Sequence, residues 1–224
     1  MSLFLSEIPS EELCPVMDYL TGKTVPVIFD LSENNEELGK LDLNNEAVFT
    51  DFIFGTLRKN KAEFGIGKYG EERVIYKRSE VFGTSRSVHL GIDLWAAAGS
   101  IIYAPLNGRI HSFADNNNHG DYGPTIIVAH EWKGHTFHTL YGHLSRQSIR
   151  DIAEGDIISK GEELGTLGTY EENVHWPPHL HFQVILDMEG KKGDYPGVCS
   201  KNEKDRYFKN CPDPNGLLRI NALK

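Results

Sequence analysis

The sequence predicts a mainly β protein built on an antiparallel sheet, with an α+β extension at its N-terminus. Three observations support this fold class. From about residue 81 onward, apolar and polar residues alternate in short runs that turn residues separate, as in half-buried strands. Two of these runs, 124–130 and 135–141, are joined by a short segment containing Gly134, which is typical of a hairpin. Residues 1–80 show helical spacing in place of strict alternation.

The N-terminal segment 1–80 contains the predicted helices. Ser10 is placed to cap a short helix that begins at Glu11, and Asn45 to cap a longer one from Glu46 to about residue 57. Apolar residues form one stripe on the longer helix, which favours a packing face. A strand is expected over 73–77, and no catalytic group is predicted in this segment. We expect the segment to pack on the main domain, 81–187, and to shape or cover its groove.

Within 81–187 the pattern predicts strands over 100–104 and 109–114, the hairpin, short strands between 154 and 165, and a strand beginning at His179. The remaining residues, 188–224, are expected to form a tail packed on the domain.

Charge and composition exclude several classes of protein. The net charge of −9 argues against a nucleic-acid partner, because affinity for phosphates comes from Lys and Arg. No apolar run is long enough for membrane insertion, and the first residues show no signal peptide, so the chain reads as soluble and cytoplasmic. A leader removed ahead of Met1 would change that expectation to a periplasmic or extracellular protein. The oligomeric state stays open.

The three cysteines, Cys14, Cys199 and Cys211, are too few for a disulfide framework. Cys199 and Cys211 are a candidate pair, and the sequence leaves their pairing open. Because no Cys-x-x-Cys occurs, a zinc site made of thiolates is not expected.

Two histidines stand out near the end of the main domain. In an extended strand His179 and His181 point to the same face, about 7 Å apart at the backbone, while Leu180 points to the other. Far upstream, His89 and Asp93 flank Gly91. A straight strand would hold them about 13 Å apart, so the chain must bend if both bind one ion, and Gly91 can adopt backbone angles that other residues avoid.

Other histidine patterns are weaker. His130 and Glu131 followed by His135 resemble the helical HExxH motif, but the histidines are five residues apart where four are needed on a helix. His130, His135 and His138 are therefore interpreted as strand and turn residues. A cupin is disfavoured because no Glu closely follows His181.

His143 lies at the end of the second hairpin strand, within Tyr-Gly-His-Leu-Ser. Together with His89-x-Gly-x-Asp93 and Pro-His179-Leu-His181-Phe, this segment resembles the lysostaphin/LytM-type zinc metallopeptidases, in order and in flanking residues. Those flanks are 97–108 after the first motif and 155–165 before the last. The resemblance covers about residues 81–187.

The resemblance implies a barrel-sandwich-like antiparallel fold and one Zn²⁺ per chain, held by His89, Asp93 and His181. It also implies that His143 and His179 are catalytic residues beside the metal, with no assignment of which one is the base. The implied activity is a zinc-dependent endopeptidase that hydrolyses peptide bonds in peptidoglycan cross-links or stem peptides. Three protein ligands leave the fourth tetrahedral position for water, as in a catalytic zinc site.

The chain departs from the family pattern before the last motif. Many members of the family have a short Gly- and Ser-rich segment there, whereas this chain has residues 169–178, which are neither. Glu171, Glu172 and Trp176 are expected to line or overhang the groove, and His175 is either a pocket or a surface residue. Two alternatives to a cell-wall endopeptidase remain. One is a zinc peptidase or amidohydrolase acting on an intracellular peptide or small amide, and the other is a latent binding or regulatory module.

Overall fold

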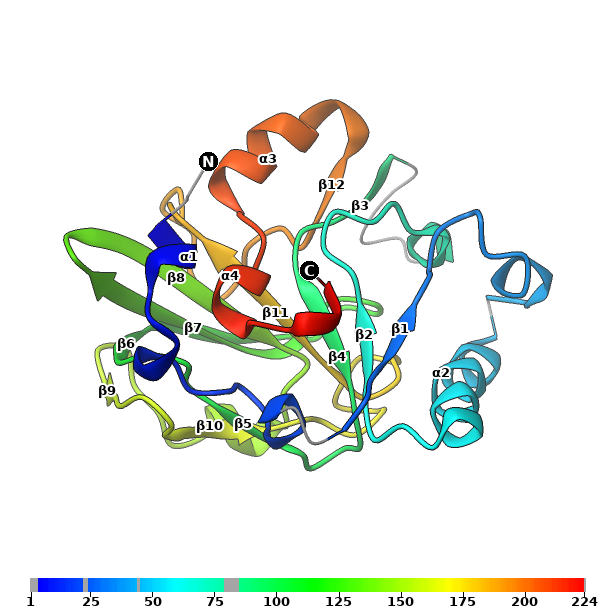
Figure 1. The fold of residues 1–224 in the computed structure, drawn as a ribbon, viewed down its shortest axis with the longest axis horizontal. Coiled ribbons are helices and arrows are strands. Elements are labelled where there is room, and N and C mark those ends of the chain that lie inside the picture. The colour runs from blue at the N-terminus through cyan, green and yellow to red at the C-terminus, as the bar shows by residue number, and fades with distance from the viewer. Residues whose placement is uncertain (1–3, 22–23, 44, 79–84, 224) are drawn as a thin grey trace.

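A computed structural model describes residues 4–21, 24–43, 45–78 and 85–223. Its centre is an eight-stranded sheet with the order β1-β2-β4-β11-β8-β7-β6-β9 (Figure 1). Neighbouring strands are antiparallel except β1 and β2, which are parallel. The prediction of a mainly β fold on an antiparallel sheet is therefore confirmed. The strands are β1 Val27–Phe29, β2 Gly65–Gly67, β4 Ile92–Trp95, β6 Gly108–Asn116, β7 Gly123–Trp132, β8 His135–Gly142, β9 Ile157–Ile158 and β11 His179–Ile185.

Smaller elements surround this sheet. β5 (Ile101–Tyr103) pairs with β10 (Glu163–Thr166), and β3 (Arg86–His89) pairs with β12 (Val198–Ser200). The α-helices are α1 Phe4–Glu7, α2 Glu46–Asn60, α3 Lys204–Asn210 and α4 Asn215–Leu218. Short 3-10 helices span 10–12, 18–21, 38–40, 74–78, 146–149, 201–203 and 221–223. None of the helices in the described part of the chain is long and apolar enough to span a bilayer.

The predicted hairpin is formed by β7 and β8, which run side by side in Figure 1. Trp132 pairs with His135, so Lys133 and Gly134 form the turn, with φ of 47° and 80°. Two positive φ values are what a tight hairpin turn requires, because they match the twist of the strands.

Strand β4 separates two environments. Ile92 and Leu94 point into the main core, where they meet Leu180 and Phe182 of β11, and all four are fully buried. Burying one such side chain contributes about 1.5–3 kcal/mol. Side chains alternate along a strand, so Asp93 must face the opposite side of the sheet.

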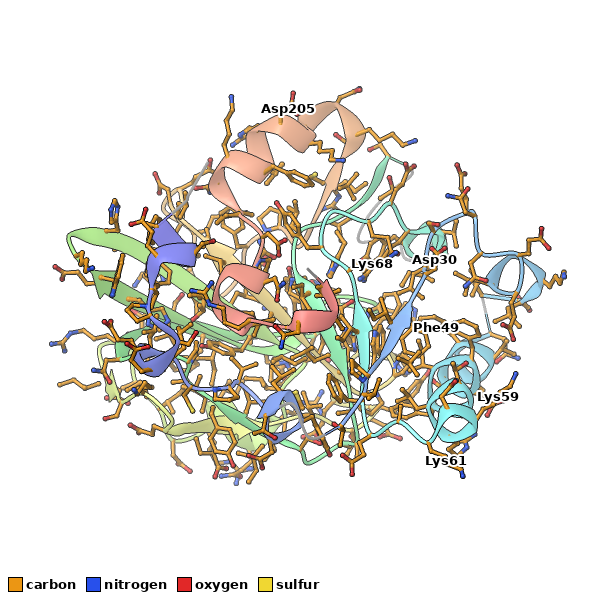
Figure 2. The ribbon with its side chains drawn as sticks, viewed as in Figure 1. Asp30, Phe49, Lys59, Lys61, Lys68 and Asp205 are labelled. Carbon is orange, nitrogen blue, oxygen red and sulfur yellow. The ribbon has the colours of Figure 1, made fainter. Side chains whose placement is uncertain are left out.

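Helix α2 covers that opposite side. As predicted, the Asn45 side chain caps it by accepting a hydrogen bond from the Ala47 amide at 3.1 Å. Phe49 points from α2 toward the sheet (Figure 2) and is fully buried. Its ring packs edge-on against Trp95 and Trp176, with centroids 5.8 and 6.2 Å away. The helix therefore closes a second apolar cluster beside the face that carries Asp93.

Two local predictions for the N-terminal segment are wrong. Ser10 is the first residue of a 3-10 helix that its side chain does not cap, because Pro9 occupies the cap position. Residues 74–78 form a 3-10 helix in place of the expected strand. Ile75 and Tyr76 are neighbours in sequence yet both are buried, which a strand exposed on one face does not allow.

Segments from both ends of the chain lie against the domain. β1 and β2, from the N-terminal segment, extend the main sheet through the β2–β4 pairing. After residue 187, β12 pairs with β3, and the Leu186 amide bonds to the Asn210 carbonyl at 2.8 Å. Cys199 and Cys211 are both buried and carry free thiols. The boundaries at residues 80 and 187 remain predictions.

Candidate metal centre

Three strands bring His89, Asp93 and His181 together. His89 ends β3, Asp93 lies inside β4, and His181 pairs directly with Asp93 across β4 and β11. All three side chains are buried. The ring nitrogens and the carboxylate oxygen form the one such cluster of three or more potential ligands found among the described residues.

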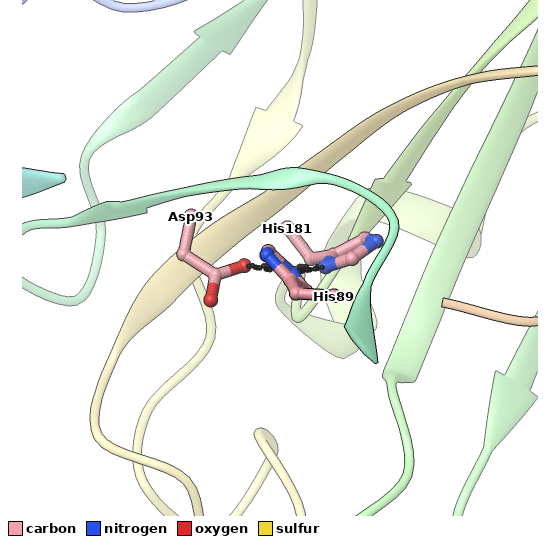
Figure 3. Close-up of side chains that lie close together, drawn as sticks. All are labelled: His89, Asp93 and His181. Atoms are coloured by element: carbon pink, nitrogen blue, oxygen red, sulfur yellow. Dashed lines mark hydrogen bonds and ion pairs between the residues drawn. The ribbon is translucent and has the colours of Figure 1, made fainter. Parts of the chain in front are cut away.

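The ligand atoms form a nearly equilateral triangle (Figure 3). His89 Nε2 lies 3.0 Å from His181 Nδ1, and Asp93 Oδ1 lies 3.2 Å from each of these nitrogens. Ligands about 2.0–2.1 Å from a tetrahedral ion are separated by about 3.3 Å. The triangle is therefore the size of one face of a tetrahedral zinc site, and its nitrogen and oxygen donors are ones that zinc accepts.

Hydrogen bonds at the far side of each imidazole select the tautomer that a metal needs. His89 Nδ1 donates to the Lys68 carbonyl at 3.0 Å, which leaves the lone pair of Nε2 in the triangle. His181 Nε2 donates to Gln183 Oε1 at 2.9 Å, which leaves the lone pair of Nδ1 there. Gln183 is held in turn, since its amide donates to the Pro196 carbonyl at 3.1 Å. Such outer hydrogen bonds are typical of metal-ligating histidines.

Asp93 is held by a residue from the N-terminal segment. Its Oδ2 accepts a short hydrogen bond from Nη1 of Arg73, whose side chain is fully buried. Although burial opposes it, the positive charge of Arg73 holds the pKa of Asp93 well below its usual value and keeps the side chain ionised. The sequence singled out no residue of the N-terminal segment for the site, and Arg73 is one that it missed.

His179 lies beside the triangle and is oriented as a proton acceptor. Its Nδ1 donates to the Pro177 carbonyl at 2.7 Å, and its Nε2 lies 4.0 Å from Asp93 Oδ1. Burial lowers the pKa of His179 to about 4, so the ring is neutral at pH 7 and Nε2 carries a lone pair toward the site.

His143 completes the group. Its ring centroid lies 4.0 Å from that of His179. Burial, with the nearby imidazoles of His179 and His181, holds its pKa well below the usual value. Its φ is 65°, a left-handed conformation that few non-glycine residues adopt. Nδ1 is buried and has no hydrogen-bond partner among the described residues, as expected of an atom that serves a ligand.

Gly91 is required for a reason other than the predicted one. Its φ does not lie in the left-handed region that favours glycine. A Cβ at this position would lie 2.7 Å from His181 Nε2 and 2.8 Å from the Phe182 carbonyl oxygen. The glycine provides space for the His181 ring to approach β4.

A pocket opens onto the triangle, lined by Asp93, His143, His179 and His181. Trp176 also lines it, as predicted, and so do Tyr76 and Arg73 from the N-terminal segment. Glu171, Glu172 and His175 do not. Glu172 accepts hydrogen bonds from the amides of Thr169 and Arg146, and His175 is exposed and packs against His119.

The other candidate histidines lie in or near the hairpin. His130 is buried and hydrogen-bonded to the Asn107 carbonyl at 2.8 Å and to Thr139 Oγ1 at 2.7 Å. His135 is exposed and stacks on Phe4, and His138 packs against His111.

Comparison with known families agrees with this geometry. Residues 87–194 match the model of peptidase family M23. The resemblance that the sequence motifs indicated is therefore confirmed for this part of the chain. The matched residues contain all three residues of the triangle and both neighbouring histidines, whereas Lys68 and Arg73 lie outside the match.

Curated proteins similar to this chain include the murein hydrolase activators NlpD of Escherichia coli (strain K12) and Shigella flexneri. Each is 29% identical over 105 residues, which is 47% of this chain. The match spans a quarter of the length of these relatives, 25% in each case.

Among solved structures, the catalytic domain of lysostaphin from Staphylococcus simulans is 21% identical, with a TM-score of 0.43, over 66% of this chain and 93% of that domain. A zinc-containing peptidase from Vibrio cholerae is also 21% identical, with a TM-score of 0.33, over 44% of this chain and 27% of that one.

Proposed function

We propose that the protein is a zinc-dependent endopeptidase that hydrolyses peptide bonds. The observation that carries the proposal is the buried triangle of His89 Nε2, Asp93 Oδ1 and His181 Nδ1, with sides of 3.0–3.2 Å, beside two further neutral imidazoles. Three protein ligands fit a catalytic zinc, which keeps one position open.

His89, Asp93 and His181 would hold the ion. When bound, zinc would polarise the scissile carbonyl and lower the pKa of its water to about 7. Nε2 of His179, whose other nitrogen is committed to Pro177, would take the proton from the attacking water and return it to the leaving amine. His143, with an unpartnered Nδ1, hydrogen-bonds the carbonyl oxygen as negative charge develops there.

Peptidoglycan is the proposed substrate. The proposal is supported by the M23 family and by relatives whose name refers to murein hydrolysis. The alternative of an intracellular peptide or small amide uses the same residues and differs only in what enters the pocket. The peptidase domain is proposed to span 81–187, between the N-terminal segment and the tail.

A second candidate is a regulatory module without activity, which the name of the NlpD relatives favours. The site argues for the enzyme, because the ligands, their outer hydrogen bonds and both neighbouring imidazoles are present together. A module that only binds a partner has no need of five buried histidine and aspartate side chains.

Zinc content and hydrolysis, measured together on purified peptidoglycan and on Gly- and Ala-containing peptides, test the proposal. We expect about one zinc per wild-type chain together with cleavage, and loss of both in His181→Ala. Zinc without cleavage of any substrate would favour the regulatory module. A wild-type protein that binds no zinc would exclude both the metal site and the mechanism.

A further inference from the structure

We propose that Arg73 is a positioning residue for the metal centre, which fixes Asp93 as a ligand through a single oxygen. Asp93 presents Oδ1 to the two imidazole nitrogens and Oδ2 to the guanidinium of Arg73. This inference rests on the proposed zinc site and adds a residue outside the part of the chain that matches family M23.

The guanidinium is fixed from several sides. Besides Asp93, Arg73 donates through Nε to Glu71 Oε2 at 3.1 Å, through Nη1 to the Tyr76 hydroxyl at 3.0 Å and through Nη2 to the Lys68 carbonyl at 3.2 Å. The Arg73 side chain is 1% exposed. A planar guanidinium held by this many acceptors is rigid and therefore defines where Asp93 Oδ2 can lie.

The same segment also positions His89. The Lys68 carbonyl accepts from both Arg73 Nη2 and His89 Nδ1, at 3.2 and 3.0 Å. Two of the three proposed ligands are thus oriented by one short segment around β2. A change in the position of Arg73 would be transmitted to Asp93 directly and to His89 through this shared oxygen.

A glycine in β2 makes room for this arrangement. Gly67 pairs with Asp93 across β2 and β4. A Cβ on Gly67 would lie 2.6 Å from Arg73 Nη2 and 3.2 Å from the Asp93 Cβ. The guanidinium therefore occupies the space that a side chain at position 67 would need.

The chemical consequence concerns the number of oxygens offered to the ion. A free carboxylate can bind a cation through both oxygens, as calcium sites show. With Oδ2 in a charge-assisted hydrogen bond to Arg73, Asp93 supplies Oδ1 alone. One position on a bound ion would then stay open for water.

Arg73→Met tests the proposal, with Arg58→Met as a matched control. Arg58 forms its ion pair with Asp51 on the exposed side of α2, where both side chains are at least 69% exposed. Zinc affinity is measured by competition with a chromophoric chelator, and coordination by the visible spectrum of the Co²⁺-substituted protein. We expect Arg73→Met to weaken zinc binding by about 10- to 100-fold and to change the Co²⁺ spectrum, and Arg58→Met to do neither.

A second variant covers the case in which Arg73→Met fails to fold. Gly67→Ala keeps every charge and displaces the guanidinium, and Gly39→Ala is its control because a Cβ there meets nothing within 4 Å. We expect Gly67→Ala to weaken zinc binding in the same direction as Arg73→Met. Unchanged affinity and Co²⁺ spectrum in a folded Arg73→Met or Gly67→Ala protein would overturn the role of Arg73 while leaving the zinc site intact. Absence of zinc from the wild type would overturn the proposed function and this inference with it.

Discussion

The imidazole of His179 lies against the indole of Trp95, with ring centroids 4.1 Å apart and planes 25° apart. Trp95 in turn meets the ring of Phe49 edge-on. These contacts link helix α2, which carries no group of the site, to a proposed catalytic histidine. The position of His179 therefore depends on aromatic packing as well as on its hydrogen bond to Pro177.

Replacing Phe49 tests this link. We expect Phe49→Leu to lower kcat several-fold without removing zinc, because Trp95 loses the ring that holds it under His179. Ile53→Val is the control, since Ile53 is also fully buried on α2. Such conservative core changes usually destabilise by about 1 kcal/mol. Equal loss of kcat in the two variants would show that Phe49 acts only through stability.

Gly91→Ala is expected to damage the metal centre directly. The added methyl group would lie 2.8 Å from the Phe182 carbonyl oxygen, which cannot move without disturbing β11, and 2.6 Å from the ring of His181. We expect destabilisation of about 1–3 kcal/mol, as in overpacked cores, together with weaker zinc binding. Denaturant unfolding and chelator competition measure the two effects. A variant with normal zinc affinity would contradict the proposed position of His181.

His143→Ala separates a catalytic role from a ligand role. We expect turnover to fall by at least about 100-fold, because the group proposed to stabilise the developing negative charge is gone. Zinc content should stay near one per chain, since the ligand triangle does not include His143. Turnover and zinc content are measured on the same preparation of the variant. Loss of zinc would show that His143 is a metal ligand.

Stability should fall in acid, and His130 should contribute to the fall together with the buried His143 and His179. Burial lowers the pKa of His130 to about 4 from the usual 6.5, so the unfolded chain binds the proton more readily than the folded one. The contribution of this residue is fully present above pH 6.5 and is lost as the pH falls toward 4, about 3 kcal/mol in all. Urea unfolding of wild type and His130→Gln at pH 7 and 5 measures it. The exposed His135→Gln should keep the wild-type pH dependence; if His130→Gln keeps it as well, His130 is not its source.

Local pattern was enough to predict the hairpin and helix α2. Alternation and turn residues give β7 and β8, and the Asn45 cap with its apolar stripe gives α2. His179 and His181 share a face because side chains alternate along a strand, whatever lies beside it. The spacing around Gly91 singled out His89 and Asp93, and the resemblance assigned roles to them and to His143. The fold brings all of these side chains close together.

The supporting residues were not predictable in the same way. Arg73 meets Asp93 across 20 positions and the Lys68 carbonyl meets His89 across 21, and no local pattern marks either Arg73 or Lys68 as part of the site. Residues 73–77 alternate as a strand does, but residues 74–78 form a 3-10 helix, in which the neighbours Ile75 and Tyr76 are both buried. These outcomes are decided by tertiary contacts, which override local preference.

The position of β4 between β2 and β11 also determines the order in which its two strand pairings can form during synthesis. On one side β4 pairs with β2, where Gly67 precedes its partner Asp93 by 26 positions. On the other side it pairs with β11, where His181 follows Asp93 by 88 positions and is therefore synthesised much later. The pairing of β4 with β2 can form early, and it fixes the backbone of Asp93 beside Gly67. The second pairing cannot form until nearly the whole domain has been synthesised. A ribosome-bound fragment that ends before β11 lacks His181 and therefore cannot complete the proposed metal site, which is assembled only when the last central strand is inserted.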